Sequence, residues 1–238
     1  MRRLSLFLIP IALAVLGLAY YLARPVVNAA DRIGRLRAYL SDPAAHADWE
    51  IKVGERCPGA PFLLPTTGYL GFGWGDSWRP GQHHQGFDIF GPTGLGQTPV
   101  VAAYDGYLTR LLDWKSTVII RVPQDPLQPS RQIWNYYTHL ADAQGSAFIS
   151  AAFPPGTTEH FVPAGTRLGY QGNYSGNPAD PVGMHLHFSI VKDDGTGRFL
   201  NELRLENTLD PSPYLGLQAA AGDDWSVPVT CAAAVDAS

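Results

Sequence analysis

The chain has 238 residues, of which 45% are hydrophobic and 16% are charged, and this composition is that of an ordinary globular protein with one main domain. Its formal net charge is −4 and no basic stripe runs along it, so the sequence gives no sign of nucleic-acid binding. The same negative balance excludes a strong electrostatic attraction to an anionic polymer.

The first predicted element is an apolar segment at residues 4–23, which follows Arg2 and Arg3. It carries no charge and is long enough to cross a hydrocarbon core of roughly 30 Å. We therefore expect residues 1–24 to be an uncleaved signal anchor or a signal peptide, and the length of the apolar run favours the anchor. The VVNAA sequence at residues 26–30 is a passable cleavage site, so both alternatives stay open.

A linker containing a short amphipathic helix is predicted next, over residues 25–56. In its DRIGRLRAYLSDPAAHADWE stretch, Ile33, Leu36 and Leu40 recur at the spacing of one helix face. Pro43 should end this helix, because proline has no backbone N–H and clashes with the preceding turn.

The pattern then changes to short apolar runs broken by glycine and proline, which is typical of an all-β domain. We expect this domain to span residues 57–217 as an antiparallel β-sandwich-like core with a groove across one sheet. Residues 218–238 form a C-terminal tail with few structural signals. The clearest predicted strands lie within residues 100–113, 116–123, 132–140, 166–172 and 184–193.

Candidate metal ligands occur in two segments that lie about a hundred residues apart. His84 and Asp88 lie in GQHHQGFDIF, and His185 and His187 lie in MHLHFSI. Side chains two or four residues apart on a β-strand share one face, so each pair should point in one direction. Taken singly, a histidine is more often a packed or surface residue, and it is the combination that indicates a site.

The same alternation selects among neighbouring residues. His83 is five residues from Asp88 and would face the other way, so His84 is the better ligand. Gly86 would lie on the metal-bearing face, where a side chain would crowd an ion. A third segment, YYTHLAD, contributes His139. Two imidazoles and one carboxylate that hold a divalent metal, with two more imidazoles beside it, match a catalytic zinc site with one position left for water.

These segments resemble the M23 family of zinc metallopeptidases, the lysostaphin- and LytM-like cell-wall endopeptidases. The family pattern of HxxxD, Tyr-x-His-Leu and HLHF is matched in order by HHQGFD, YTHL and MHLHF. The resemblance covers roughly residues 60–215, and the combined motifs are highly specific. It implies the same fold class, which the family builds as a duplicated hybrid motif.

Carried over residue by residue, the resemblance implies that His84, Asp88 and His187 bind one Zn²⁺ per chain. It implies that His139 and His185 are the catalytic histidines. The substrate would be a peptide of bacterial peptidoglycan, which places the domain on the extracytoplasmic side of the cell envelope. The N-terminal segment would then either anchor the protein in the membrane or direct its secretion.

Two other functions are weighed against this one. A non-catalytic M23-like regulator that binds wall peptide or activates a wall amidase would be favoured by missing ligands, and no ligand position is missing. A sugar-transport phosphocarrier uses a histidine pair on a related fold. The export signal and the carboxylate of HxxxD oppose that alternative.

Three further expectations concern the surroundings of the site. Cys57 and Cys231 flank the domain, and in an exported protein such a pair suggests a disulfide, with two unpaired thiols as the alternative. The long segments 141–163 and 177–183 should wall the groove. Tyr137 should share the strand face of His139, where it either lines the groove or packs in the core.

Overall fold

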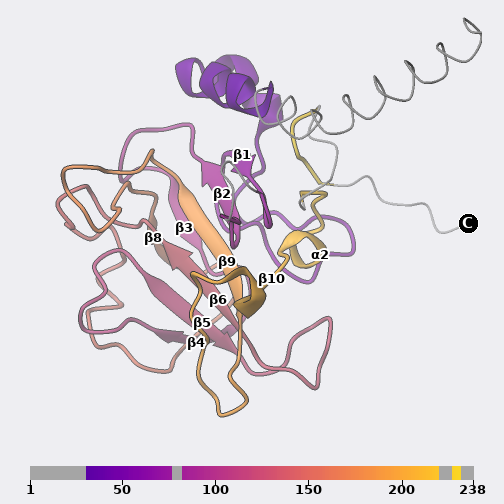
Figure 1. Ribbon diagram of the computed structural model, residues 1–238, viewed down its shortest axis with the longest axis vertical. Helices are drawn as coiled ribbons and strands as arrows, with labels where there is room; N and C mark the ends of the chain where they lie inside the picture. The colour runs from indigo at the N-terminus through magenta and orange to yellow at the C-terminus, as the bar shows by residue number, and fades with distance from the viewer. Residues whose placement is uncertain (1–30, 77–81, 220–226, 232–238) are drawn as a thin grey trace, which may run out of the picture.

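The computed structural model describes residues 31–76, 82–219 and 227–231. Within these residues the structure is mostly antiparallel β-sheet, and the helices are few and short (Figure 1). The strands are β1 (Tyr69–Phe72), β2 (Phe87–Phe90), β3 (Pro99–Val101), β4 (Gly106–Thr109), β5 (Val118–Val122), β6 (Ile133–Thr138), β7 (His160–Val162), β8 (Arg167–Tyr170), β9 (Leu186–Lys192) and β10 (Thr208–Leu209). The helical elements are residues 31–41, η1 (Ala44–Trp49), η2 (Leu205–Asn207) and α2 (Ser212–Leu215).

The described strands form one large sheet and one small sheet. The large sheet has the order β1-β2-β9-β6-β5-β4-β7, with β10 paired to β9 off this path, and β3 pairs with β8 in the small sheet. Every strand pair is antiparallel. In the register of the large sheet, His187 of β9 lies between Asp88 of β2 and Thr138 of β6. Segments far apart in the sequence therefore meet at the centre of the sheet.

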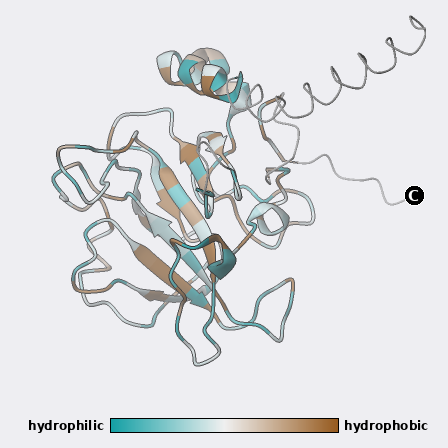
Figure 2. Ribbon diagram, viewed as in Figure 1, coloured by the Kyte–Doolittle hydropathy of each residue, from teal (hydrophilic) through white to brown (hydrophobic). Residues whose placement is uncertain are grey.

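The two faces of the large sheet differ because successive side chains on a strand point to opposite sides. On β2 and β9, the residues that enter the core are Phe87, Ile89, Leu186, Phe188 and Ile190. Their neighbours Asp88, His187 and Ser189 point to the other face. Hydrophobic and hydrophilic bands accordingly alternate along β9 in Figure 2. One face of the sheet is thus core, and the other carries the polar side chains of β2 and β9 together with a smaller hydrophobic cluster of Ile119, Trp134 and Val191.

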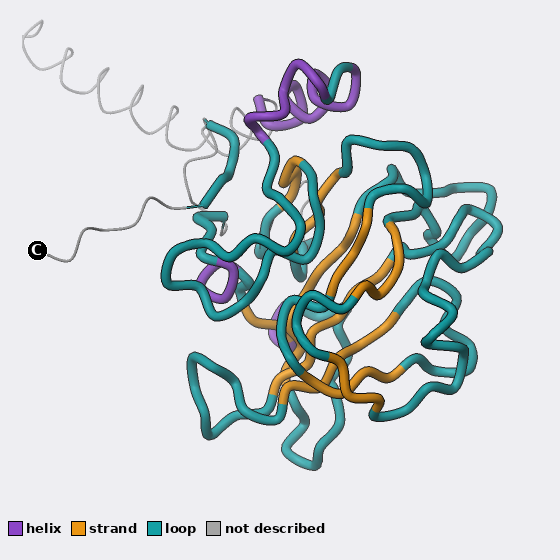
Figure 3. Tube along the Cα trace, turned by 180° about the vertical axis from the view of Figure 1, so that it is seen from behind, coloured by secondary structure: helices purple, strands orange, loops and turns teal. Residues whose placement is uncertain are grey.

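A second layer covers the core face and completes the sandwich-like arrangement. Val100 of β3 and Leu168 of β8 pack into the same hydrophobic cluster as the large sheet, together with Phe62, Leu64 and Ile149 from the connecting segments. Seen from behind, the strands lie at the centre of the domain and loops surround them (Figure 3). The covering layer is thin and rich in loops, so the sandwich is asymmetric.

The predicted helix is present, but its buried face is not the expected one. Leu36 is buried as predicted, whereas Leu40 is 47% exposed and Ile33 is only half-buried. Tyr39 takes the buried place, and with Leu36 it packs against Tyr69 of β1 and Phe90 of β2. The prediction for Leu40 was wrong because the helix docks on a surface that sequence periodicity does not show. The described part of the expected linker is therefore packed on the domain.

The structure describes only part of the two chain ends for which the sequence makes predictions. Residues 1–24, where a signal anchor or signal peptide is expected, lie outside the described residues. Among residues 31–76, 82–219 and 227–231, no helix is long and apolar enough to span a membrane. The C-terminal tail is described only at residues 218–219 and 227–231.

A disulfide joins Cys57 to Cys231, across 174 positions of sequence, as the cysteine pair predicts. Cys57 is 1% exposed and belongs to the main hydrophobic cluster. Cys231 forms an isolated antiparallel β-bridge with Leu217. The bond therefore fastens the tail to the entrance of the domain.

We predict that the double substitution Cys57→Ala with Cys231→Ala lowers the free energy of unfolding by about 2–5 kcal/mol, because the cross-link restricts the unfolded chain. Urea denaturation followed by tryptophan fluorescence measures this change. The free energy of unfolding of the parent should fall by the same amount when its disulfide is reduced. That of the double variant should not change with reductant. Equal stability of parent and variant would contradict the assigned role.

Candidate metal centre

The site is built on β2 and β9, whose pairing places Asp88 directly opposite His187. His84 lies before β2 and not on it, so the shared strand face expected for His84 and Asp88 is wrong, although it selects the same residue. A turn positions His84 instead. The backbone N–H of His84 donates to the carbonyl of Asp76 at 2.8 Å, and the N–H of Gly75 donates to the carbonyl of His84 at 2.7 Å.

Gly86 lies where the chain approaches β9 closely. A Cβ at this position would meet the carbonyl oxygen of Phe188 at 2.2 Å and the Cβ of Ser189 at 2.8 Å. The missing side chain thus allows the backbone to approach β9 closely as it enters β2. The atoms that this Cβ would meet first belong to β9 and not to the ligand cluster.

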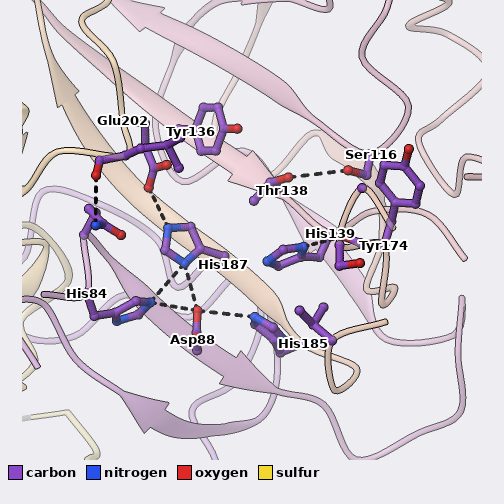
Figure 4. A pocket seen from close by; sticks show the side chains of 15 residues that line it. His84, Asp88, Ser116, Tyr136, Thr138, His139, Tyr174, His185, His187 and Glu202 are labelled. Atoms are coloured by element: carbon purple, nitrogen blue, oxygen red, sulfur yellow. Dashed lines mark hydrogen bonds and ion pairs between the residues drawn. The ribbon is translucent and has the colours of Figure 1, made fainter. Parts of the chain in front are cut away.

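Three potential ligand atoms converge on the polar face of the sheet (Figure 4). Asp88 Oδ1 lies 3.0 Å from His84 Nε2 and 2.8 Å from His187 Nδ1. The two histidine nitrogens are 3.1 Å apart. All three side chains are buried. One carboxylate oxygen and two imidazole nitrogens are a donor set that zinc binds in proteins.

A hydrogen bond on the far side of each imidazole leaves the other ring nitrogen available as a potential ligand. His84 Nδ1–H donates to the carbonyl of Gly73 at 2.9 Å, and His187 Nε2–H donates to Glu202 Oε1 at 2.8 Å. A neutral ring that donates there presents a lone pair at its other nitrogen. Two lone pairs and a carboxylate oxygen would then face one another. The cluster requires a positive charge at its centre, which a proton or a metal ion supplies.

Electrostatics support the same conclusion. Burial by itself raises the pKa of Asp88, but His84 and His185 hold that pKa well below its usual range, so the carboxylate is ionised. Burial lowers the pKa of His187, but Glu202 and Asp88 together raise it to about 10. Two buried carboxylates therefore stabilise a positive charge at this position, which either a protonated His187 ring or a metal ion can carry. The residues present fit a bound divalent metal.

Glu202 is the residue that the sequence did not reveal. It lies in the segment between β9 and β10, and besides His187 it accepts a hydrogen bond from Ser189 Oγ at 3.2 Å. A carboxylate behind a metal-binding histidine fixes the orientation of the ring. That rule predicts that some partner exists, but the chain has many acidic residues and no spacing singles out Glu202.

His139 and His185 lie beside the cluster, with ring centroids 4.6 Å apart. Each Nδ1–H donates to a backbone carbonyl, at 2.7 Å to Tyr174 for His139 and at 2.6 Å to Gly183 for His185. Both rings thus turn Nε2 away from these carbonyls, and His185 Nε2 lies 3.3 Å from Asp88 Oδ1. Burial, helped by the neighbouring His185, lowers the pKa of His139 to about 3, so this ring is neutral at pH 7.

Tyr137 packs in the core and does not line the groove. It is fully buried, lies 5.2 Å from Phe188 between ring centroids, and accepts a hydrogen bond from the backbone of Ala103 at its hydroxyl. Tyr136 lines the groove instead. The expected alternation fails at His139, where φ of 69° reverses the backbone at the end of β6.

An open groove of about 430 Å³ lies over the five predicted site residues. Its remaining lining comes from Gln85, Ser116, Tyr136, Thr138, Tyr174, Ser175, Gly176, Val182, Glu202 and Leu203. The expected wall at residues 141–163 was wrong, because none of these described residues lines the groove. They pack on β8 through Ile149 and supply β7, which pairs with β4 at the edge of the sheet. Of the segment 177–183, only Val182 contributes.

Neither a protein-family model nor a curated protein matches the sequence. Solved structures that are similar include a protein named as a peptidase M23 from Pseudomonas aeruginosa, with 21% identity, a TM-score of 0.38, and coverage of 78% of this chain and 61% of that one. A second is named as a glycyl-glycine endopeptidase LytM from Ruminococcus gnavus, with 25% identity, a TM-score of 0.35, and coverage of 54% and 44%.

A third similar structure is a mutant catalytic domain of the prophage-encoded M23 protein EnpA from Enterococcus faecalis, with 24% identity, a TM-score of 0.34, and coverage of 63% of this chain and 95% of that one. The chain thus spans 61% and 44% of the first two structures. All three carry M23 or LytM names.

We predict that Glu202→Ala raises the zinc dissociation constant by about 10–100-fold, because His187 loses the partner that orients it. Competition with a chromophoric chelator measures this constant. The matched control is Glu206→Ala in the same segment, whose side chain is exposed and pairs only at the surface with Arg204. If Glu202→Ala binds zinc as tightly as the parent, Glu202 does not orient the ligand.

Proposed function

We propose that this protein is a zinc-dependent endopeptidase that hydrolyses peptide bonds in bacterial cell-wall peptidoglycan. The proposal rests on one observation: His84, Asp88 and His187 converge beside the His139–His185 pair on the floor of an open groove. Three ligands with two unligated imidazoles alongside are the arrangement that metal-assisted hydrolysis needs.

The ligands and the catalytic histidines divide the chemistry between them. A zinc ion held by the three ligands would lower the pKa of a bound water towards about 7 and polarise the carbonyl of the substrate. Asp88, ionised and held by its histidine neighbours, keeps negative charge at the ligand position. Glu202 keeps Nδ1 of His187 directed to the same point.

His139 and His185 are proposed to move protons. Since both rings donate from Nδ1 to backbone carbonyls, the atom that can accept a proton is Nε2 in each. A neutral imidazole at that place takes a proton from the attacking water and returns it to the leaving amine. The fixed carbonyl partners hold the rings in the required tautomer and orientation.

The substrate class and the location of the protein are parts of the same proposal. The order HxxxD, YTHL, HLHF favours a wall peptide, and an open groove accommodates an extended chain. The Cys57–Cys231 disulfide supports an oxidising compartment outside the cytoplasm. The apolar segment at residues 4–23 would anchor the protein to the membrane or direct its export.

The first test is metal dependence. We predict that the purified protein binds about one zinc per chain and releases amino groups from purified peptidoglycan, and that a chelator abolishes both until zinc is restored. Asp88→Ala should lose zinc and hydrolysis together, since two ligands remain. Wall cleavage that survives complete removal of metal would refute a zinc enzyme, and zinc binding without cleavage would favour a regulator.

The second test separates ligands from catalysts. We predict that His139→Ala and His185→Ala retain zinc but lose about 10²–10⁴-fold in hydrolysis rate, the usual contribution of a general acid or base. Metal content and rate are measured on the same preparation. His83→Ala is the control, because His83 is exposed and does not line the groove. Loss of zinc from the His185 variant would make that residue a ligand.

A further inference from the structure

A buried ion pair connects the N-terminal helix to the segment that carries a metal ligand. Arg32, on the helix over residues 31–41, donates through Nη1 to Asp76, at 3.0 Å from Oδ1 and 2.9 Å from Oδ2. Arg32 is 7% exposed and Asp76 is 8% exposed. Charged side chains are rarely buried to this extent unless they are paired, so the two hold each other in place.

Asp76 also forms hydrogen bonds that hold the segment carrying His84 in place. Its Oδ2 accepts a hydrogen bond from the backbone N–H of Gly73 at 2.7 Å, and its carbonyl accepts one from the N–H of His84 at 2.8 Å. The carbonyl of Gly73 is the acceptor for His84 Nδ1–H, at 2.9 Å. Asp76 therefore fixes both the backbone of His84 and the Gly73 carbonyl that sets the tautomer of the His84 ring.

Aromatic contacts link the same helix to the site by a second route. Leu36 and Tyr39 pack against Phe90, whose ring stacks on that of His185 with centroids 5.0 Å apart and an interplanar angle of 28°. The guanidinium of Arg32 also lies over the ring of Phe72 at 5.8 Å, and Phe72 meets His84 edge-on at 6.4 Å.

We propose that the helix over residues 31–41 is a positioning element of the metal centre, in which Arg32 acts through Asp76 to hold His84 in ligand geometry. The inference rests on the proposed metal site and adds residues that support one of its ligands.

The first measurement does not involve metal. In the full-length protein kept with a chelator, amide hydrogen exchange of Gly75 and His84 reports the two hydrogen bonds that close the turn. We predict that Arg32→Ala accelerates exchange at both amides. Arg37→Ala, an exposed arginine of the same helix, should leave both unchanged.

The second measurement is the zinc dissociation constant of the same variants, determined by chelator competition. We predict a rise of about tenfold for Arg32→Ala, at the lower end of what loss of a ligand's supporting partner costs. Asp76→Ala should raise the zinc dissociation constant at least as much. Arg32→Lys keeps the cation, so its dissociation constant should lie between those of Arg32→Ala and the parent.

A matched control separates positioning from general stability. Arg131→Ala also removes the cation from a buried carboxylate, since Arg131 pairs with the fully buried Asp125. It should lower the melting temperature without changing the zinc dissociation constant or the exchange of Gly75 and His84. An equal loss of zinc affinity in this variant would reduce the role of Arg32 to fold stability and overturn the inference.

The outcomes also distinguish this inference from the proposed function. If the parent binds zinc and Arg32→Ala binds it equally well, the metal site stands and the inference is refuted. Unchanged exchange at Gly75 and His84 in Arg32→Ala refutes it as well. If the parent binds no zinc while Arg32→Ala still accelerates exchange, the proposed function fails and the link from Arg32 to His84 is upheld. Should Arg32→Ala not fold, Arg32→Lys provides both readouts.

Discussion

The antiparallel pairing of β2 with β9 is the constraint on which the rest of the site depends. It places Asp88 opposite His187, with the core residues Phe87 and Ile89 on the other side of the sheet. A register shift of one residue would turn every side chain to the opposite face, which would bury a carboxylate in the core and expose phenylalanine. The hydrophobic core therefore maintains the ligand geometry, because the same alternation that buries one set of side chains presents the other. Gly86 allows this pairing by letting the two backbones approach at the start of β2.

Around this pair, the site is supported by groups that do not belong to the sequence motifs. Glu202 holds His187, the carbonyl of Gly73 holds His84, and the carbonyls of Tyr174 and Gly183 hold the two catalytic candidates. Each imidazole is thereby restricted to one orientation before any ligand arrives. Such preorganisation is what makes a buried polar cluster useful, since unpaired groups there would cost free energy. The buried pair of Arg32 and Asp76 extends this support to the N-terminal helix.

Sequence reasoning succeeded where a local pattern has a single physical meaning. Alternation within MHLHFSI predicted the opposite faces of His187 and Phe188, and β4, β5, β6 and β9 of the large sheet lie within the apolar runs identified. It failed where a tertiary contact decides. His84 lies in a loop positioned by Asp76 instead of on a strand, and Tyr137 does not share a face with His139, because the backbone changes direction at His139, where φ is 69°. Residues 141–163 looked like a groove wall because of their length, but length does not show on which edge of a sheet a segment lies.

The sequence by itself determined the residue types of the site, the all-β pattern and the two cysteines that can pair. These follow from spacing and composition, which are local properties. The tertiary structure decided which atoms face one another. Only the packed sheet brings His84 Nε2, Asp88 Oδ1 and His187 Nδ1 within 3.1 Å, and only the fold places Glu202 behind His187 and Arg32 against Asp76. The physical reason is that contacts between residues far apart in the chain depend on strand register and on the docking of surfaces. Neither leaves a periodic trace in the amino-acid sequence.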